Sequence, residues 1–153
     1  MKVKKIPFEE FKSIYSRVPR LCVEVVILQE KKLLLIKRTI PPALGKWHTP
    51  GGTILKGENI ARAVERVAKE ELGISVRILQ FLGIIEYTSY VNHYSQDISL
   101  AFLVEIKRTV HTTQFNLDVH ADEYNFFKEI PLNTIVEQKK FYSKNLGLAV
   151  SKK

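Results

Sequence analysis

Residues 50–74, PGGTILKGENIARAVERVAKEELGI, combine two glycines, spaced acidic residues and a helical repeat in one short unit. Gly51 and Gly52 directly follow Pro50, which predicts a break in any preceding strand and a close approach of the main chain to a ligand. From about Asn59 the apolar spacing becomes helical, and Gly73 is typical of a helix end. This stretch therefore predicts a glycine-containing loop that leads into a helix.

Two acidic residues stand near the end of that predicted helix. Glu71 continues the apolar stripe that contains Val64 and Val67, and Glu70 stands beside it. A carboxylate on an apolar stripe is costly to bury unless it is paired or bound to a metal. Because carboxylate oxygens suit hard divalent cations, the pair predicts a cation site. The alternative is a solvent-exposed helix face with i,i+4 ion pairs, such as Arg66 with Glu70.

The same stretch resembles the Nudix box of the MutT-related Nudix hydrolases, G-x5-E-x7-R-E-U-x-E-E-x-G-U, where U is aliphatic. The residues at its fixed positions are Gly52, Glu58, Arg66, Ala68, Glu70, Glu71, Gly73 and Ile74. The resemblance implies metal ligation by Glu71, Glu70 and the main-chain carbonyl of Gly51 or Gly52. One position departs, because the family's Glu after the Arg, a metal ligand and often the base, is Val67 here. For Glu58 with Arg66, a structural ion pair is an equal alternative to a chemical role.

A second resemblance covers most of the chain. It is to the GDP-mannose mannosyl hydrolases, a Nudix branch with a KRT-x-x-P-A-x-G-x-W segment and an apolar residue after the box Arg. The matching residues here are Lys37, Arg38, Thr39, Pro42, Ala43, Gly45 and Trp47. That branch attacks the sugar carbon with a histidine base and a Gln ligand from a late loop. Here Ala121 stands at the histidine position, His120 at the Gln position, and Thr53 replaces an Arg of the branch.

Several residues are therefore candidates for the chemistry. His120 is a ligand or base displaced by one residue, or a solvated loop side chain, and Asp122 and Glu123 are alternative bases. Arg38 ends the strand-like run LLLIKR, where it can bind phosphate oxygens or remain an exposed charge. Trp47, with the main chain of Gly51 and Gly52, completes the predicted substrate site, although core packing is the safer assignment for Trp47.

Length and composition limit the remaining possibilities. A chain of 153 residues fits one domain, with a helical extension over residues 1–20 and the box over residues 50–74. Cys22 is the only cysteine and lies in an apolar run, which indicates a buried thiol. No apolar targeting segment or membrane span is evident, which predicts a cytoplasmic protein. The net charge of +8 comes from scattered Lys and Arg, which favours polyphosphate attraction or solubility over nucleic-acid binding.

The apolar patterns predict helices over residues 7–17, 59–73 and 131–142, and strands over residues 21–28, 32–39, 75–87, 98–106 and 123–127. Residues 40–49, 88–96 and 109–120 read as loops. This order predicts an α/β or α+β layered fold. The Nudix resemblance implies a mixed β-sheet between helices.

The favoured function is Mg²⁺-dependent hydrolysis of a nucleoside diphosphate linked to another group, with a GDP-mannose-like nucleotide sugar as the substrate class and Mn²⁺ as an alternative cation. A nucleoside triphosphate pyrophosphohydrolase is a second interpretation. A nucleotide-binding or regulatory domain, with catalysis lost through Val67, is a third. No membrane partner is expected, and a homodimer is the assembly left open.

Overall fold

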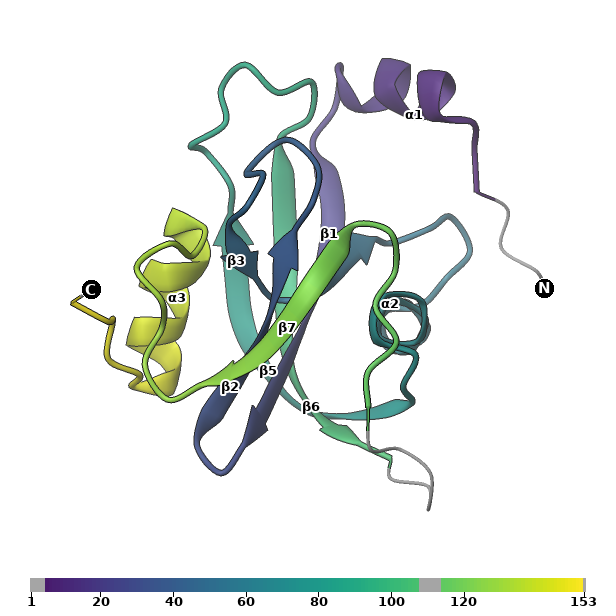
Figure 1. The fold of residues 1–153 in the computed structure, drawn as a ribbon. Coiled ribbons are helices and arrows are strands. Elements are labelled where there is room, and N and C mark those ends of the chain that lie inside the picture. Colours follow the sequence, from purple (N-terminus) through teal and green to yellow (C-terminus); the bar gives the residue numbers. More distant parts are fainter. Residues whose placement is uncertain (1–4, 108–113, 153) are drawn as a thin grey trace.

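The computed structural model describes residues 5–107 and 114–152 (Figure 1). Its elements are α1 (Phe8–Tyr15), β1 (Arg20–Gln29), β2 (Lys32–Arg38), β3 (Trp47–His48), β4 (Gly51–Thr53), α2 (Ile60–Leu72), β5 (Val76–Glu86), β6 (Asp97–Ile106), β7 (Ala121–Phe127) and α3 (Val136–Leu146). The predicted order of helix, strands, helix, strands, helix is confirmed. Among the described residues, none of the helices has the length and apolar character needed to span a membrane.

The strands form one mixed sheet in the order β3-β2-β1-β6-β5, with β4 paired to β1 and β7 paired to β2. β1 lies parallel to β6 and antiparallel to β2 and β4. Helices α2 and α3 lie on opposite sides of the sheet (Figure 1). The α+β layered fold, with a mixed sheet between helices, is therefore as predicted.

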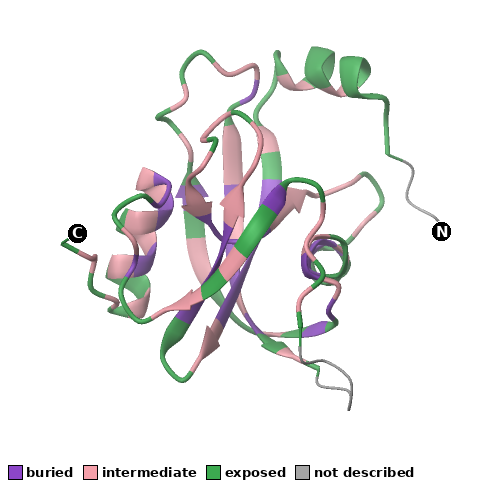
Figure 2. Ribbon diagram, viewed as in Figure 1, coloured by how far each residue is buried: buried purple, intermediate pink, exposed green. Residues whose placement is uncertain are grey.

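Each face of the sheet has its own apolar core (Figure 2). Along β1, Val23, Val25 and Ile27 belong to the cluster that packs under α2, whereas Val26 belongs to the cluster under α3. This division follows from the alternation of side chains along a strand. Glu24 lies between Val23 and Val25, so it occupies a position that faces α3.

Local sequence explains the placement of α2. Asn59 caps its first turn by accepting a hydrogen bond from the main-chain nitrogen of Arg62 at 2.9 Å. Gly73 ends it with a φ of 70°, a left-handed conformation that glycine adopts readily. Val64 and Val67 are buried as the stripe predicts, but Ile60 at its start is exposed. The helix consequently delivers its last turn, with Glu71, to the glycine pair.

Two predictions about the main chain around the glycines are only partly right. The strand before the glycines ends at His48 as predicted, but Gly51 and Gly52 form the short strand β4 rather than a loop, because they pair with Glu24 and Val23 of β1. Residues 40–49 are irregular only in part, since Trp47–His48 forms β3 by pairing with β2. The peptide bond between Pro41 and Pro42 is cis.

The last helix begins five residues later than predicted. Thr134 donates its main-chain N–H to Pro131, and Ile135 donates to the carbonyl of Trp47, so this segment forms a turn that is tied to β3. The helix then runs from Val136 to Leu146 rather than ending at residue 142. Part of the predicted loop over residues 109–120 falls outside the described residues, and residues 114–120 contain no regular element.

Strand β5 forms where a strand is predicted, over Val76–Glu86, but its pairing is irregular. It forms one edge of the sheet, and its pairing with β6 shifts register twice, between Ile78 and Gln80 and between Phe81 and Gly83. These shifts are β-bulges, which twist a strand and put extra residues out of the ladder. Phe81 and Ile84 are about half exposed as a result of the edge position. Helix α1 forms within the predicted range but contains no buried residue.

Candidate active site

Glu71 lies at the C-terminal end of α2, beside the first glycine of β4. Its Oε2 accepts a hydrogen bond from the main-chain nitrogen of Gly51 at 3.1 Å. Burial raises the pKa of Glu71 to about 8, and the nearby negative charge of Asp118 adds to the rise. The Gly51 hydrogen bond and the positive charge of Arg38 oppose it. Glu71 is therefore a carboxylate whose charge is poorly compensated by the protein.

The two glycines are required by the close packing around them. A Cβ atom added to Gly51 would lie 2.6 Å from Oε2 of Glu24, and one added to Gly52 would lie 2.9 Å from Cγ2 of Val67. Both distances are shorter than real Cβ contacts. Gly51 thus lies between two carboxylates, Glu24 on one side and Glu71 on the other, while Val67 packs against the main chain of Gly52.

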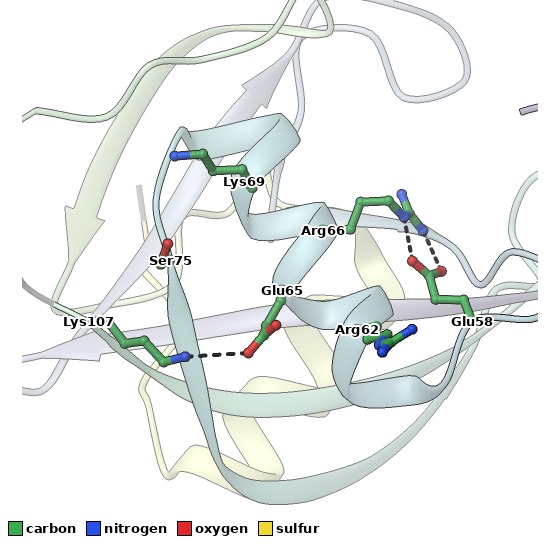
Figure 3. A pocket seen from close by; sticks show the side chains of 7 residues that line it. All are labelled: Glu58, Arg62, Glu65, Arg66, Lys69, Ser75 and Lys107. Carbon is green, nitrogen blue, oxygen red and sulfur yellow. Dashed lines mark hydrogen bonds and ion pairs between the residues drawn. The ribbon is translucent and has the colours of Figure 1, made fainter. Parts of the chain in front are cut away.

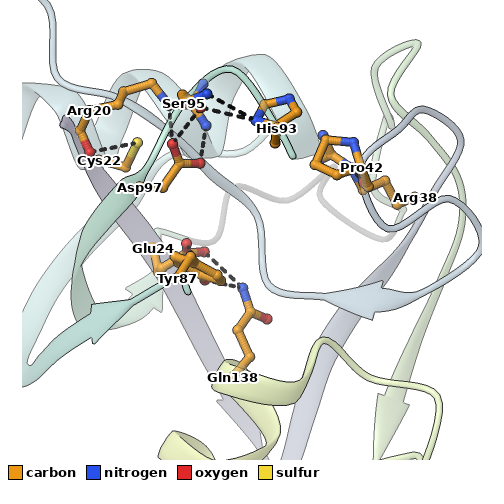
Figure 4. Close-up of polar contacts among 10 residues, drawn as sticks. All are labelled: Arg20, Cys22, Glu24, Arg38, Pro42, Tyr87, His93, Ser95, Asp97 and Gln138. Carbon is orange, nitrogen blue, oxygen red and sulfur yellow. Dashed lines mark hydrogen bonds and ion pairs between the residues drawn. The ribbon is translucent and has the colours of Figure 1, made fainter. Parts of the chain in front are cut away.

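Glu24 is the centre of a buried polar network (Figure 4). Its side chain accepts hydrogen bonds from Thr49 Oγ1 at 2.9 Å and Tyr87 OH at 2.8 Å. Gln138 of α3 donates to Tyr87 OH at 2.7 Å, and the Thr49 and Tyr142 hydroxyls lie 2.7 Å apart. Burial raises the pKa of Glu24 to about 7, although these hydrogen bonds lower it. In the sequence, Glu24 interrupts an apolar run, which predicts a side chain that faces the site rather than the core. The structure buries Glu24 and places its carboxylate against Gly51.

Arg38 lies at the end of β2 and is half-buried. Its Nε donates to the carbonyls of Ile40, at 3.0 Å, and Pro42, at 2.6 Å. Within the described parts of the chain, these are the only hydrogen bonds of the Arg38 side chain, so its terminal amino groups have no hydrogen-bond partner there. Burial lowers the pKa of Arg38, and the charge of Glu71 opposes that effect. The predicted phosphate-binding Arg therefore lies within electrostatic reach of the predicted metal ligand.

His120 and Asp118 form a pair next to this region. Nδ1 of His120 lies 3.2 Å from Oδ2 of Asp118, and the main-chain nitrogen of His120 donates to Oδ1 of Asp118 at 2.8 Å. The His120 carbonyl accepts the N–H of Thr39, which holds this loop beside the end of β2. Asp118 also influences Glu71, as described above. Asp118 was missed by sequence reasoning, and no spacing signal distinguished it from other loop acids.

The two alternative bases are placed less favourably. Glu123 of β7 is exposed and forms an ion pair with Lys37 at 3.2 Å. The Nζ atom of Lys37 also lies 5.7 Å from the centre of the Trp47 ring. Trp47 packs against the apolar cluster under α3, whereas Ile36, next to Lys37 in the strand, belongs to the cluster under α2. Asp122 is exposed at the bulge between β2 and β7. Neither is linked to Glu71 by any contact that the structure describes.

The other positions of the Nudix-like box stabilise the loop before α2. Arg66 binds Glu58 through two hydrogen bonds of 2.7 and 3.0 Å and donates to the carbonyl of Thr53 at 2.7 Å. This supports the structural alternative for Glu58 with Arg66. Glu70 is exposed and accepts from Arg66 at 3.1 Å and from Lys5 at 3.0 Å. Glu70 thus forms ion pairs with Arg66 and Lys5, whereas Glu71 is the acid of the two that contacts the glycine pair.

Trp47 packs into the α3-side core, with its ring 4.8 Å from that of Phe127. This placement favours the core assignment over contact with a substrate base.

An open pocket of about 450 Å³ lies along the outer face of α2 (Figure 3). Its walls are mostly charged side chains, several of them in ion pairs such as Glu65 with Lys107. The lining residues are Glu58, Arg62, Glu65, Arg66, Lys69, Ser75 and Lys107. Glu71 is not among them, so this pocket is separate from the candidate site.

The residues around Gly51 fit a hard divalent cation. The available donors are oxygens: the Glu71 carboxylate, the carbonyls of β4 and, from the late loop, Asp118. A bound cation would favour the ionised form of Glu71, whose pKa is otherwise raised. Across residues 5–107 and 114–152, no three His, Cys, Asp or Glu side chains gather as a complete ligand set. Main-chain carbonyls or substrate oxygens would therefore have to complete the coordination.

A mixed sheet between two helices, with an acidic helix end against a glycine pair, defines the class of this protein. The family profile described as NUDIX domain matches residues 18–145. The chain therefore belongs to the Nudix family, and it is a hydrolase.

Individual relatives agree with that assignment. The chain is 35% identical over 127 residues to "Low-salt glycan biosynthesis protein Agl8" of Haloferax volcanii. The matched region covers 81% of this chain and 80% of that protein. It is 38% identical over 66 residues to an ADP-ribose pyrophosphatase of Methanocaldococcus jannaschii, covering 43% of this chain and 39% of that protein. The fold is similar to a MutT NUDIX hydrolase from Burkholderia pseudomallei, with a TM-score of 0.71, 22% identity, and 81% and 95% of the two chains covered.

Proposed function

We propose that this Nudix hydrolase cleaves a nucleoside diphosphate linked to a sugar, with Mg²⁺ held at Glu71. The observation that carries the proposal is a poorly compensated carboxylate, Glu71, that contacts the main chain of Gly51 and lies within electrostatic reach of a half-buried cation, Arg38. A divalent cation at Glu71 would offset phosphate charge, and Arg38 would bind phosphate oxygens. Mn²⁺ would suit the same oxygen donors.

Two of the relatives support the substrate class. The Haloferax volcanii relative, which covers 81% of this chain, is named for glycan biosynthesis, which favours a sugar-containing substrate. A second relative is named as an ADP-ribose pyrophosphatase, which favours a nucleoside diphosphate with a further group attached. A nucleotide sugar satisfies both descriptions.

His120 is the proposed base, held by Asp118. A carboxylate 3.2 Å from Nδ1 can keep the ring oriented so that Nε2 accepts a proton from water. This arrangement, with Val67 in place of the Glu that often activates water in the family, favours attack at the sugar carbon. Attack at phosphorus is the second candidate, because the name pyrophosphatase of the second relative describes cleavage between phosphates.

Hydrolysis in oxygen-18 water tests the reaction. Nucleotide sugars and nucleoside triphosphates are first screened with MgCl₂, and the best substrate is then cleaved in labelled water. Carbon attack is expected to put the label in the released sugar, provided the sugar is analysed before its anomeric oxygen exchanges. Label in a phosphate product instead means phosphorus attack.

Two variants test the base. His120→Ala is expected to lower kcat by about 100-fold or more, the usual contribution of a general base. Glu123→Gln is the matched control, because its carboxylate pairs with Lys37 and is expected to leave kcat within about twofold. Equal effects of the two changes would remove His120 from this role.

A further inference from the structure

A group of aromatic side chains lies between α1 and the loop that joins β5 to β6, and the proposed chemistry does not use it. Tyr94, in the loop between β5 and β6, contacts the rings of Phe8 and Phe11 of α1 edge to face, with centroids 6.2 and 6.5 Å apart. His93 packs against Tyr94 with a centroid distance of 4.2 Å. Phe8 is nevertheless 62% exposed, and α1 buries none of its residues. This aromatic cluster, Phe8, Phe11, His93 and Tyr94, is therefore open to solvent.

A set of polar contacts fixes the cluster to the sheet. Arg20 forms a two-point ion pair with Asp97, with Nε donating to Oδ1 at 2.8 Å. Ser95 Oγ donates to the same Oδ1 at 2.9 Å, which holds the end of the aromatic loop. Cζ of Arg20 lies 5.7 Å from the centre of the Phe11 ring, so the same Arg also supports α1. These contacts connect α1 and the aromatic loop to the starts of β1 and β6.

The aromatic cluster lies near the residues of the candidate site. Burial raises the pKa of Tyr94, while the positive charges of Arg20 and Arg38 oppose that rise. Arg38 in turn lies within electrostatic reach of Glu71. Lys5, just before α1, donates to Glu70, the neighbour of Glu71, at 3.0 Å, which brings the start of α1 to the end of α2. Arg38 is within electrostatic reach of both Glu71, the predicted cation ligand, and Tyr94 of the aromatic cluster.

We propose that the aromatic cluster binds the nucleobase of the substrate by stacking, chiefly on Phe8 and Tyr94. The proposal rests on the proposed function, because Arg38 and the cation would hold the diphosphate and so direct the base toward α1. Aromatic rings bind any nucleobase through its flat face, and rings fixed in advance lose little freedom on binding. Helix α1 and the loop between β5 and β6 would then form the base subsite.

Equilibrium binding tests this assignment without relying on hydrolysis. Calorimetric titrations in MgCl₂ would compare ADP, GDP, UDP and CDP with inorganic pyrophosphate, which has no base. We expect at least one nucleoside diphosphate to bind about tenfold or more tightly than pyrophosphate, the range expected for one stacked base. If pyrophosphate binds as tightly as every nucleoside diphosphate, the proposal is overturned.

Variants locate the stacking surface. Phe8→Leu and Tyr94→Ala are each expected to weaken nucleoside diphosphate binding about tenfold and to leave pyrophosphate binding unchanged. Phe8→Leu keeps an apolar side chain on α1, so a loss in this variant reports the ring rather than helix docking. Phe81→Ala, which removes a half-exposed ring from β5, is the matched control. Three results would overturn the proposal. They are equal weakening of nucleoside diphosphate and pyrophosphate binding, weakening of the same size in the Phe81→Ala control, and unchanged binding in both Phe8→Leu and Tyr94→Ala.

The same data separate this inference from the proposed function. If the protein binds nucleoside diphosphates through Phe8 and Tyr94 but hydrolyses no nucleotide sugar, the base subsite is supported and the proposed activity is wrong. If it hydrolyses nucleotide sugars and binding is unchanged in both variants, the proposed activity is supported and the base subsite is wrong.

Discussion

Replacing Glu24 by Gln should make the folded protein more stable at alkaline pH. Glu24 is only 5% exposed, and burial raises its pKa from 4.5 to about 7. Between these two values the folded protein keeps a proton that the unfolded chain has released. The free energy of unfolding therefore falls as the pH rises from 4.5 to about 7, and this decrease is complete above the pKa of Glu24 in the folded protein.

The size of the effect follows from that difference in pKa. At about 1.4 kcal/mol for each pH unit, the ionised Glu24 costs about 3 kcal/mol at pH 8 and less than about 1 kcal/mol at pH 5. A Gln side chain has no charge to bury, and its oxygen can still accept from Tyr87. The Thr49 hydroxyl can accept from the new amide if it donates to Tyr142, since either hydroxyl of that pair can be the donor. The variant should therefore keep most of the network.

Urea unfolding with EDTA at pH 5 and pH 8 measures the difference. The free energy of unfolding of Glu24→Gln, relative to that of the wild type, is expected to be about 2 to 3 kcal/mol higher at pH 8 than at pH 5. The m-value should be unchanged. Glu129→Gln, at an exposed position, is the matched control and should leave the pH dependence of stability as it is. A Glu24→Gln gain that is the same at both pH values would refute the argument that burial of this charge sets the cost.

Two further predictions concern the end of α2. Glu71→Gln is expected to lower kcat by about 100-fold or more while the protein stays folded, since the change removes the proposed metal-binding charge; wild-type turnover at saturating MgCl₂ would contradict it. Val67→Glu places a carboxylate against the main chain of Gly52, where the Val67 side chain now packs, and should tighten Mg²⁺ binding or change which bond is cleaved. Calorimetry that finds the same Mg²⁺ affinity, with the same products, would mean that residue 67 does not face the cation.

The helix that carries Glu71 was predictable because its signals are local. Asn59, the apolar stripe and Gly73 each act within a few residues, and the structure uses them as predicted. The strand formed by Gly51 and Gly52 was not predictable, because it depends on pairing with β1 at a distance in sequence. In the same way, the burial of Glu24 depends on Tyr87 and Gln138 from two later elements. No local pattern records which side chains meet there.

The irregular ladder of β5 limits how copies of this protein can meet. An exposed edge strand normally offers an unbroken row of N–H and C=O groups, and these can be extended by strand after strand from other molecules. The bulges at Leu79 and Leu82 put that row out of step, while Phe81 and Ile84 still offer apolar surface beside it. A second copy could therefore meet this edge through side chains, as a closed pair, but would find no regular template for open-ended growth into a fibre.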